Sequence, residues 1–267
     1  MWTTVPAEVG MSLDEVDTPS LVLDLDAFER NLARMAAAVP GPDVRLRPHA
    51  KSHKCPEIAR RQMAHGAVGV CCQKVSEAEA MIRGGIDNVL VSNEVVGNRK
   101  LDRLAALAAR AWVGVCVDHP DNVAAIEAAA ARHAVTVDVL VEIDSGAGRC
   151  GVAPGAPALD LARRIADSAH LRFAGLQAYQ GSAQHVRSPA ERRDKAARAV
   201  TLTAETVSAL EAAGLPCGIV GGGGTGTWQI EAGSGVYTEI QAGSYVFMDA
   251  DYARNDGANE LPATMFE

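Results

Sequence analysis

The chain has 267 residues, 48% of them hydrophobic, and a formal net charge of -8. That length can bury a large core, most simply as a single α/β domain, and an acidic balance without Lys/Arg-rich runs argues against nucleic acid as a partner. The first twenty residues lack the features of a secretory leader, and no apolar stretch approaches the ~18 residues of a membrane span. We therefore expect a cytoplasmic protein with no membrane partner.

Six cysteines occur without a C-x-x-C pair, and four of them lie in apolar runs that resemble buried strands. Free cysteine is among the residues most often buried. We therefore expect reduced cysteines, mostly in the core. They are Cys55, Cys71, Cys72, Cys116, Cys150 and Cys217.

The chain opens with a predicted strand and a predicted helix. Residues 20–25 alternate apolar and other side chains, which indicates a strand. Asp26 and Glu29 then form a capping-box-like start of a helix. One face of that helix carries Phe28, Leu32 and Met35.

Short apolar runs then alternate with alanine-rich helical patterns. Stretches such as 56–66 and 76–84 have helical spacing and end in glycine, as helices with an αL cap do. Alternating strands and helices predict a parallel sheet, and eight units favour a (β/α)8 TIM-like barrel, although the count alone leaves an open doubly wound sheet possible. The predicted strands are 44–46, 67–72, 89–92, 112–117, 137–143, 171–178, 217–220 and 239–242.

The segment Arg47-Pro-His-Ala-Lys-Ser-His-Lys54 places Lys51 between His49 and His53 at the end of the first of these runs. If the strand continued, the three side chains would share one face. An amine crowded by potential cations is biased towards its neutral form, which can build a Schiff base with a carbonyl. Lys51 is therefore a candidate nucleophile, although a lysine is more often a surface residue.

Several other polar residues follow the predicted strands, where the working residues of a parallel barrel lie. Gln73 ends the second run, Arg149 lies in the loop after the fifth, and Tyr179 and His185 follow the sixth. We expect these side chains to converge with Lys51 on one pocket.

A glycine run, Gly221-Gly-Gly-Gly224, follows the seventh predicted strand and precedes Thr225. Backbone N-H groups without Cβ obstruction, together with a hydroxyl, suit a phosphate dianion. Gly223, Gly224 and Thr225 are therefore candidate phosphate ligands, and Gly243 and Ser244 after the eighth run are a second group of donors. A merely flexible hinge is the alternative for the glycine run.

A Schiff-base lysine and a phosphate site on one barrel imply pyridoxal 5'-phosphate. Arg149 is then a candidate partner of the pyridine nitrogen. An arginine stays protonated, so it would keep that nitrogen unprotonated and weaken the ring as an electron sink.

Six motifs together carry a family resemblance that runs from about Asp17 to Asn255: RPHAKSHK, GVCCQKVSEAE, GAGRCGV, QAYQGSAQH, GGGGTGT and SGVYTEIQAGSYVFMDADYARN. The chain resembles the D-threonine aldolase/D-serine dehydratase family, which is similar to the N-terminal barrel of alanine racemase. Within that family, the D-3-hydroxyaspartate aldolase branch is the most similar.

The resemblance implies roles for individual residues. Lys51 would bind the cofactor covalently, Arg149 would contact the pyridine nitrogen, and Tyr179 would line the pocket. His185 matches the general base that removes the proton of the substrate β-hydroxyl, so that a D-3-hydroxy amino acid is cleaved to glycine and an aldehyde. Further cofactor contacts implied by the resemblance are Gln73, Thr225, Gly243 and Ser244.

Members of the family continue into a C-terminal β domain, which supplies a histidine and a second ligand for a divalent metal such as Mg or Mn. No His follows His185 here, so we expect those ligands to be absent from this chain. Asp249 and Asp251 are interpreted as a solvated turn. The expected domains are 1–25, a strand of the β domain; 26–247, the barrel; and 248–267, the start of a truncated β domain. Family precedent implies a homodimer.

Two other functions stay open. D-serine dehydration would use the same scaffold, with the β-hydroxyl leaving instead of the Cα-Cβ bond breaking. A non-catalytic pyridoxal-phosphate carrier also has a barrel of about this length, but it needs neither QAYQGSAQH nor SYVFMDADYARN.

Overall fold

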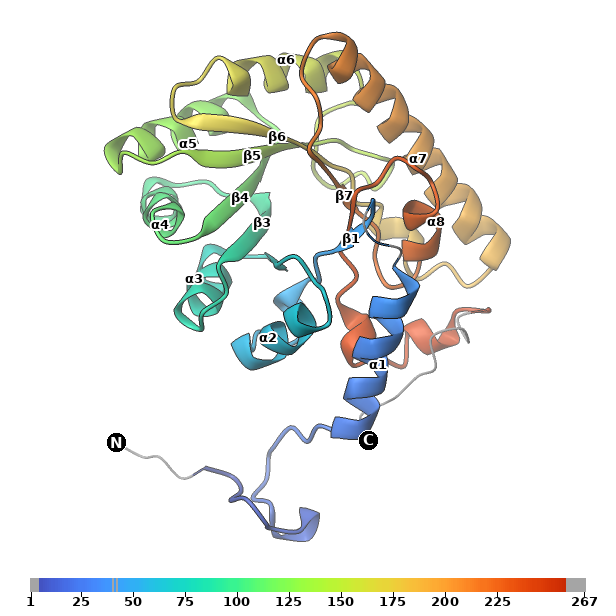
Figure 1. Cartoon of the computed structure of the whole chain (residues 1–267). Helices are drawn as coiled ribbons and strands as arrows, with labels where there is room; N and C mark the ends of the chain where they lie inside the picture. Colours follow the sequence, from blue (N-terminus) through green and yellow to red (C-terminus); the bar gives the residue numbers. More distant parts are fainter. Residues whose placement is uncertain (1–4, 40, 42, 258–267) are drawn as a thin grey trace.

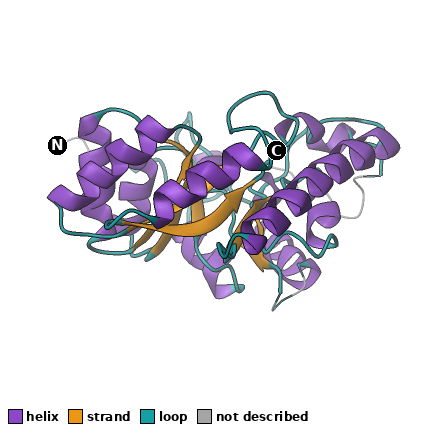
Figure 2. Ribbon diagram, turned by 90° about the horizontal axis from the view of Figure 1, so that it is seen from above, coloured by secondary structure: helices purple, strands orange, loops and turns teal. Residues whose placement is uncertain are grey.

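Eight parallel strands form one curled sheet at the centre of the molecule, and helices surround it (Figures 1 and 2). The computed structural model describes residues 5–39, 41 and 43–257. The strands are β1 (Arg45–Leu46), β2 (Val70–Cys72), β3 (Asn88–Glu94), β4 (Trp112–Val117), β5 (Val137–Glu142), β6 (Leu171–Gln177), β7 (Ile219–Gly222) and β8 (Glu239–Ile240).

The sheet closes into a barrel at the junction of β1 and β2. Hydrogen-bonded neighbours run in the order β1-β8-β7-β6-β5-β4-β3-β2, so β1 and β2 are the two edges. The amide of Val68 donates to Leu46 O (2.9 Å), and a parallel bridge pairs His49 with Cys71. These contacts confirm the expected (β/α)8 barrel over an open sheet.

The helices connect successive strands, except for α1, which precedes β1. They are α1 (Leu25–Ala38), α2 (Pro56–Ala64), α3 (Val75–Arg83), α4 (Asn98–Ala108), α5 (Pro120–Arg132), α6 (Ala156–Ala166), α7 (Pro189–Ala212) and α8 (Trp228–Ala232). α1 packs beside a short 3-10 turn after β8, η4 (Ser244–Val246), where Asn31 Nδ2 donates to Val246 O (3.4 Å). It therefore occupies the place of a helix after the eighth strand.

The apolar core has two layers. A small inner cluster fills the barrel between the strands, and a larger shell packs the outer faces of the strands against the helices, as in other barrels of this architecture. All six cysteines are free, but only Cys71, Cys72 and Cys116 are buried, so the expectation of a core position holds for three of the six. The buried residues of the inner cluster are Cys71, Leu90, Cys116, Leu140 and Ile219.

A buried ion pair closes the end of the barrel that holds the strand N-termini. Arg47 Nε lies 2.6 Å from Glu239 Oε2, and both side chains are almost fully buried. Arg47 also donates to Asn88 Oδ1 (2.5 Å). The polar residues that follow the strands lie at the opposite end, where the strands terminate.

The predicted strand over residues 20–25 does not form in the described structure. Residues 20–24 adopt no hydrogen-bonded strand, and Leu21 and Val22 are exposed on a segment that extends away from the barrel (Figure 1). An alternating pattern becomes a strand only when another strand pairs with it. None of the described residues pairs with this segment.

Two helix boundaries also differ from expectation. Helix α1 begins two residues earlier, because Asp24, and not Asp26, is the N-cap and accepts from Ala27 N (2.9 Å). Helix α2 is followed by Gly66 at φ +95°, as predicted, but after α3 the positive φ belongs to Gly85 (+89°). The predicted buried face of α1 is confirmed, since Phe28, Leu32 and Met35 are buried.

Residues 248–257 lie against the barrel. They include a 3-10 turn, η5 (Tyr252–Arg254), and the side chain of Asn255 donates to Gln184 O (2.9 Å). The domain boundaries stay predictions, and residues 1–4 and 258–267 lie outside the described residues. Within the described part of the chain, no helix is long and apolar enough to cross a membrane.

Candidate active site

A cleft of about 510 Å³ opens at the C-terminal ends of the strands. Its position matches that of active sites in α/β barrels. The strand ends and the loops after them provide its polar lining. The lining residues are His49, Lys51, Ser52, Gln73, Ser92, Arg149, Gln177, Tyr179, Gly224, Thr225, Gln241, Gly243, Ser244 and Tyr252.

Lys51 lies on a 3-10 turn, η2 (Ala50–Ser52), directly after β1. The turn begins at His49, whose Nδ1 accepts from the amide of Lys51 (3.3 Å). The expectation that His49, Lys51 and His53 share a strand face is therefore wrong. The strand ends at Leu46, and Pro48, which lacks an amide hydrogen, follows within two residues.

The pKa of Lys51 lies below its ordinary value, in the predicted direction but for a different reason. Burial within the cleft is the main cause, followed by the positive charge of Arg149. The histidines contribute no charge, because burial lowers the pKa of His49 to about 3 and that of His53 to about 4. The cleft thus favours the nucleophilic, neutral form of the amine.

Arg149 and Lys51 meet around the ring of Tyr179. The Lys51 Nζ lies 5.9 Å from the ring centroid, and the Arg149 guanidinium carbon lies 5.7 Å from it. Burial raises the pKa of Tyr179, so its hydroxyl stays protonated at neutral pH. The predicted convergence of these three residues is found.

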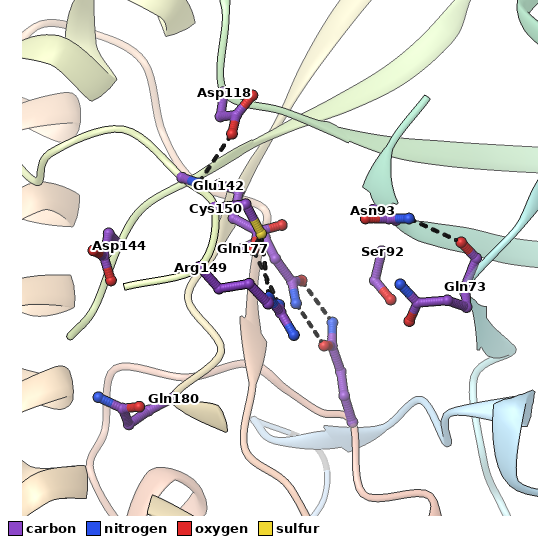
Figure 3. Close-up of polar contacts among 12 residues, drawn as sticks. Gln73, Ser92, Asn93, Asp118, Glu142, Asp144, Arg149, Cys150, Gln177 and Gln180 are labelled. Atoms are coloured by element: carbon purple, nitrogen blue, oxygen red, sulfur yellow. Dashed lines mark hydrogen bonds and ion pairs between the residues drawn. The ribbon is translucent and has the colours of Figure 1, made fainter. Parts of the chain in front are cut away.

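The opposite wall of the cleft comes from β2 and β3. Ser92 Oγ lies 3.3 Å from His49 Nε2, and the backbone amide of Gln73 donates to Glu77 Oε2 (2.7 Å). Asn93 Nδ2 donates to the carbonyl of Gln73 (3.2 Å), as Figure 3 shows. These bonds fix the Gln73 backbone, while its side chain lines the cleft beside His49, to which it hydrogen-bonds.

The glycine loop after β7 brings Gly224 and Thr225 to the cleft. A Cβ on Gly224 would lie 2.3 Å from Gln184 Oε1, so only glycine fits there. The Thr225 hydroxyl is buried and has no hydrogen-bond partner. A buried hydroxyl without a partner is costly, which indicates that the loop is shaped for a bound acceptor.

Gly223 does not line the cleft. Its φ of +70° makes the turn, and its surroundings are Ile240 and Glu231. Gly243 does line it and packs on the Lys51 turn, since an added Cβ would lie 2.7 Å from His49 O. The glycines after β7 and β8 therefore allow the chain to pack closely on its neighbours, and they also leave room for a ligand.

His185 lies at the rim and does not line the cleft. Its Nδ1 is 2.6 Å from Asp251 Oδ2, and its ring is tilted against that of Tyr252 with centroids 4.4 Å apart. Tyr252 does line the cleft. Asp251 lies in a turn with its side chain half exposed, as expected, and it also pairs with Arg187.

A model of the family described as "Alanine racemase, N-terminal domain" matches residues 23–251. The chain belongs to this family. It is 51% identical over 251 residues to a D-threonine aldolase from Arthrobacter sp. and 49% identical over 252 residues to a 3-hydroxy-D-aspartate aldolase from Paracoccus denitrificans (strain Pd 1222). Each match covers 94% of this chain, but only 66% and 65% of the respective relative, so the chain spans about two thirds of their length.

A solved structure has the same fold. The crystal structure of D-threonine aldolase from Filomicrobium marinum superposes with a TM-score of 0.94 at 58% sequence identity. The match covers 98% of this chain and 71% of that one. These similarities confirm the expected resemblance to the D-threonine aldolase family and its alanine racemase-like barrel.

Within this alanine racemase-like barrel, the structure adds residues that the sequence did not single out. Gln177 and Gln241 form a reciprocal amide pair, with N–O distances of 2.7 and 2.8 Å (Figure 3). Both end or follow a strand, so the strand-end rule applied to Gln73 would have found them. Ser52, Tyr252 and Asp251 had no such signal, because their positions depend on how the loops fold back.

Acidic side chains also gather behind Arg149. Arg149 Nη2 lies 3.4 Å from Glu142 Oε1, which accepts from the Cys150 thiol as well (2.9 Å; Figure 3). One ligand atom each from Glu94, Glu142 and Cys150 lies within 4.8 Å of the others. This cluster is outside the cleft lining and is considered below.

Proposed function

We propose that this chain binds pyridoxal 5'-phosphate through Lys51 and belongs to an enzyme that cleaves D-3-hydroxy amino acids to glycine and an aldehyde. The observation that carries the proposal is the convergence of Lys51, Arg149 and Tyr179 with the glycine loop in one cleft. About half of the residues are identical to those of an aldolase of D-threonine and of one of 3-hydroxy-D-aspartate, which supports this substrate class.

The donor set fits the cofactor. Lys51 offers an amine biased towards its neutral form, as a carbonyl requires. The orphaned Thr225 hydroxyl and the amides of the glycine loop suit its phosphate, with Gly243 and Ser244 on the other side. Arg149 would meet the pyridine nitrogen, and Gln73 would contact the remaining edge of the ring. When bound, the cofactor would supply an electron sink for the bond that breaks.

The residues of the chain would orient the substrate and move one proton. We propose that His185 accepts the proton of the substrate β-hydroxyl at Nε2. Asp251 accepts from Nδ1-H, which leaves the lone pair on Nε2. The pKa of Asp251 is lowered, mainly because Arg187 hydrogen-bonds to it, so the carboxylate stays ionised. Tyr252, stacked on His185, would hold the ring at the edge of the cleft.

Borohydride reduction tests the covalent link. Protein incubated with pyridoxal 5'-phosphate and then reduced should carry the mass of a reduced adduct on the peptide that contains Lys51. Lys51→Ala should lose that adduct, together with the visible absorbance of the bound cofactor. An adduct confined to other lysines would contradict the proposal.

Product analysis separates the two lyase reactions and the carrier. D-threonine or D-3-hydroxyaspartate should give glycine and an aldehyde, whereas dehydration of D-serine would give pyruvate. Cofactor binding without either product would favour the carrier. Because the chain spans about two thirds of its curated relatives, the assay should use the longest available polypeptide, with and without added Mg²⁺ or Mn²⁺.

We also propose a cytoplasmic location and a homodimer, in which a divalent metal is bound by residues outside this chain. The metal requirement, the dimer and the location all rest on the family resemblance. Light scattering of the purified protein would test the dimer, and a monomer at micromolar concentration would contradict it.

A further inference from the structure

Two carboxylates, Glu94 and Glu142, lie behind Arg149 and outside the cleft. Glu94 ends β3 and Glu142 ends β5, so the two side chains meet across the end of β4. One ligand atom each from Glu94, Glu142 and Cys150 lies within 4.8 Å of the others. The proposed chemistry uses neither carboxylate.

Hydrogen bonds account for only one oxygen of Glu142. Its Oε1 accepts from the Cys150 thiol (2.9 Å) and lies 3.4 Å from Arg149 Nη2. Its Oε2 is buried without a partner, although the side chain is only 3% exposed. Glu94 Oε1 is likewise buried and unpartnered. Two acceptor oxygens without donors, close together in the interior, require a positive charge between them.

The charges of the groups around Glu142 show how much positive charge the two carboxylates still need. Glu94 faces it from β3, Cys116 from β4, and Arg149 and Cys150 from the loop after β5. Both thiols stay neutral, since burial raises the pKa of Cys150 to about 12 and holds the pKa of Cys116 well above its ordinary value. Two ionised carboxylates would therefore face a single arginine, and one added proton would balance the charges.

We propose that Glu94 and Glu142 share one proton and that the pair, with a single negative charge, positions Arg149 at the cleft. The second part rests on the proposed function, because the orientation of Arg149 matters for a cofactor ring. The raised pKa of Glu142, about 7, agrees with this arrangement; burial is its main cause, and the charge of Glu94 comes next. Two carboxyls in one site cannot both ionise freely.

A divalent cation would be the other way to satisfy these oxygens. It would take Cys150 as a thiolate, because the thiolate is the form that binds metal. The Cys150 thiol instead donates to Glu142, and the Arg149 guanidinium occupies the same carboxylate oxygen. Both contacts favour the proton over the metal.

Glutamine variants test the shared proton in cofactor-free protein. In Glu142→Gln the new amide can donate to Glu94, and in Glu94→Gln it can donate to Glu142, so the remaining carboxylate should ionise. At pH 6 the infrared intensity that the protonated Glu94–Glu142 pair contributes should therefore be lost from both variants relative to wild type, while the band of protonated Glu231, whose pKa burial raises to about 7, should remain. The exposed Glu205→Gln serves as the matched control and should keep the band. Unchanged bands in both variants would overturn the proposal.

Metal titration tests the alternative. Zn²⁺ and Mn²⁺, each added alone to cofactor-free protein, should show no stoichiometric binding that depends on this cluster. Cys150→Ser keeps a hydroxyl that can donate to Glu142, so the infrared band should persist in that variant. If wild type bound one equivalent of metal and both Cys150→Ser and Glu142→Gln lost it, the cluster would hold a cation and not a shared proton.

Cofactor affinity tests the positioning of Arg149. Each single glutamine variant keeps one negative charge, so its Kd for pyridoxal 5'-phosphate should change by less than about threefold, whereas E94Q/E142Q should bind about tenfold more weakly. An unchanged Kd in the double variant would overturn the positioning role. If wild type itself fails to bind the cofactor, the proposed function fails, while the infrared result still decides the shared proton.

Discussion

Asp251 contacts the two basic side chains of the rim, His185 and Arg187. Asp251→Asn should lower kcat by at least about tenfold, because general-base catalysis depends on the correct tautomer and orientation of the imidazole. The KM and the cofactor absorbance should change little, since the residue is outside the cleft lining. Steady-state kinetics with a D-3-hydroxy amino acid would measure both parameters.

Asp249 provides a matched control for Asp251. Its Oδ1 accepts from the amides of Asp251 and Tyr252, at 2.9 and 2.8 Å, and an asparagine keeps that oxygen. Asp249→Asn should therefore retain kcat. Equal losses in the two variants would mean that the turn matters as a whole, and His185→Ala with undiminished cleavage would remove the histidine from the mechanism.

The Thr225 hydroxyl should affect affinity and stability in opposite directions. Thr225→Val removes a buried hydroxyl that has no partner, so cofactor-free protein should unfold at the same denaturant concentration or a higher one. The same change removes a donor to the phosphate, and the Kd for pyridoxal 5'-phosphate should rise about ten- to a hundredfold. Thr225→Ser is the control and should keep affinity. Reduced stability in the valine variant would show that the hydroxyl already has a structural role.

The site residues differ in how far sequence alone could find them. Lys51, Gln73, Arg149 and Tyr179 follow strands directly, and strand ends in a parallel barrel converge whatever the loops do. The loop that holds His185 runs past the cleft, and its position depends on the pairing with Asp251, 66 positions further on. Such pairings arise from tertiary packing, which no local pattern encodes.

Among the elements, the loop from β7 to α8 depends most on a glycine, because Gly224 has no Cβ to collide with its neighbour. Gln184, which faces Gly224, is fixed because its amide donates to Thr227 Oγ1 (2.8 Å) and its Oε1 accepts from Gly226 N (3.0 Å). Gly224→Ala should therefore cost about 1–3 kcal/mol of unfolding free energy, as overpacking in a core does. Chemical denaturation of the cofactor-free protein would measure it.

Gly218 is the matched control for that substitution. It lies just before β7, and its nearest neighbour to an added Cβ is Ala174 O at 3.5 Å, an ordinary contact. Gly218→Ala should change the unfolding free energy by less than about 0.5 kcal/mol. If Gly224→Ala cost as little unfolding free energy as Gly218→Ala, the Gln184 side chain would have moved aside, and the contact at Gly224 would not restrict the residue there.

Elements were predictable where their pattern met its partner inside the chain. The eight apolar runs became strands because each has a neighbour on both sides or a bridge that closes the ring. Residues 20–24 alternate just as well but find no strand to pair with among the described residues. The N-cap is Asp24 and not Asp26, because the Asp24 side chain accepts from the Ala27 amide.

At the scale of the molecule, closure of the barrel explains why the site lies at one end. The Arg47–Glu239 ion pair fills the end with the strand N-termini, and the inner cluster fills the middle. The polar side chains that follow the strands gather at the end with the strand C-termini. The sequence predicted the barrel from its repeated units, but the way in which β1 and β2 join depends on loop conformations such as the turn at Lys51.

A buried acid links the stability of the whole molecule to pH. Burial raises the pKa of Glu231 to about 7, and Thr227 donates to its Oε1 (2.8 Å), while Oε2 has no partner. In the unfolded chain a glutamate titrates near about 4.3. The folded state therefore binds more protons between these values, so the stabilisation is complete below about pH 4 and is lost as the pH rises through about 7.

Glu231→Gln should remove this dependence, because the amide cannot ionise. Between pH 5 and pH 8 the unfolding free energy of wild type should fall more than that of the variant, by an amount on the order of 3 kcal/mol. Denaturant unfolding at a series of pH values would measure the difference, and the exposed Glu205→Gln should follow wild type. Since the glutamine variant leaves Glu142 in place, and burial raises the pKa of Glu142 to about 7 as well, a slope of similar size should remain in it. Parallel curves for wild type and Glu231→Gln would mean that Glu231 is ionised in the folded protein. The glycine loop, which packs on Glu231 at Gly223, would then contact a charged side chain.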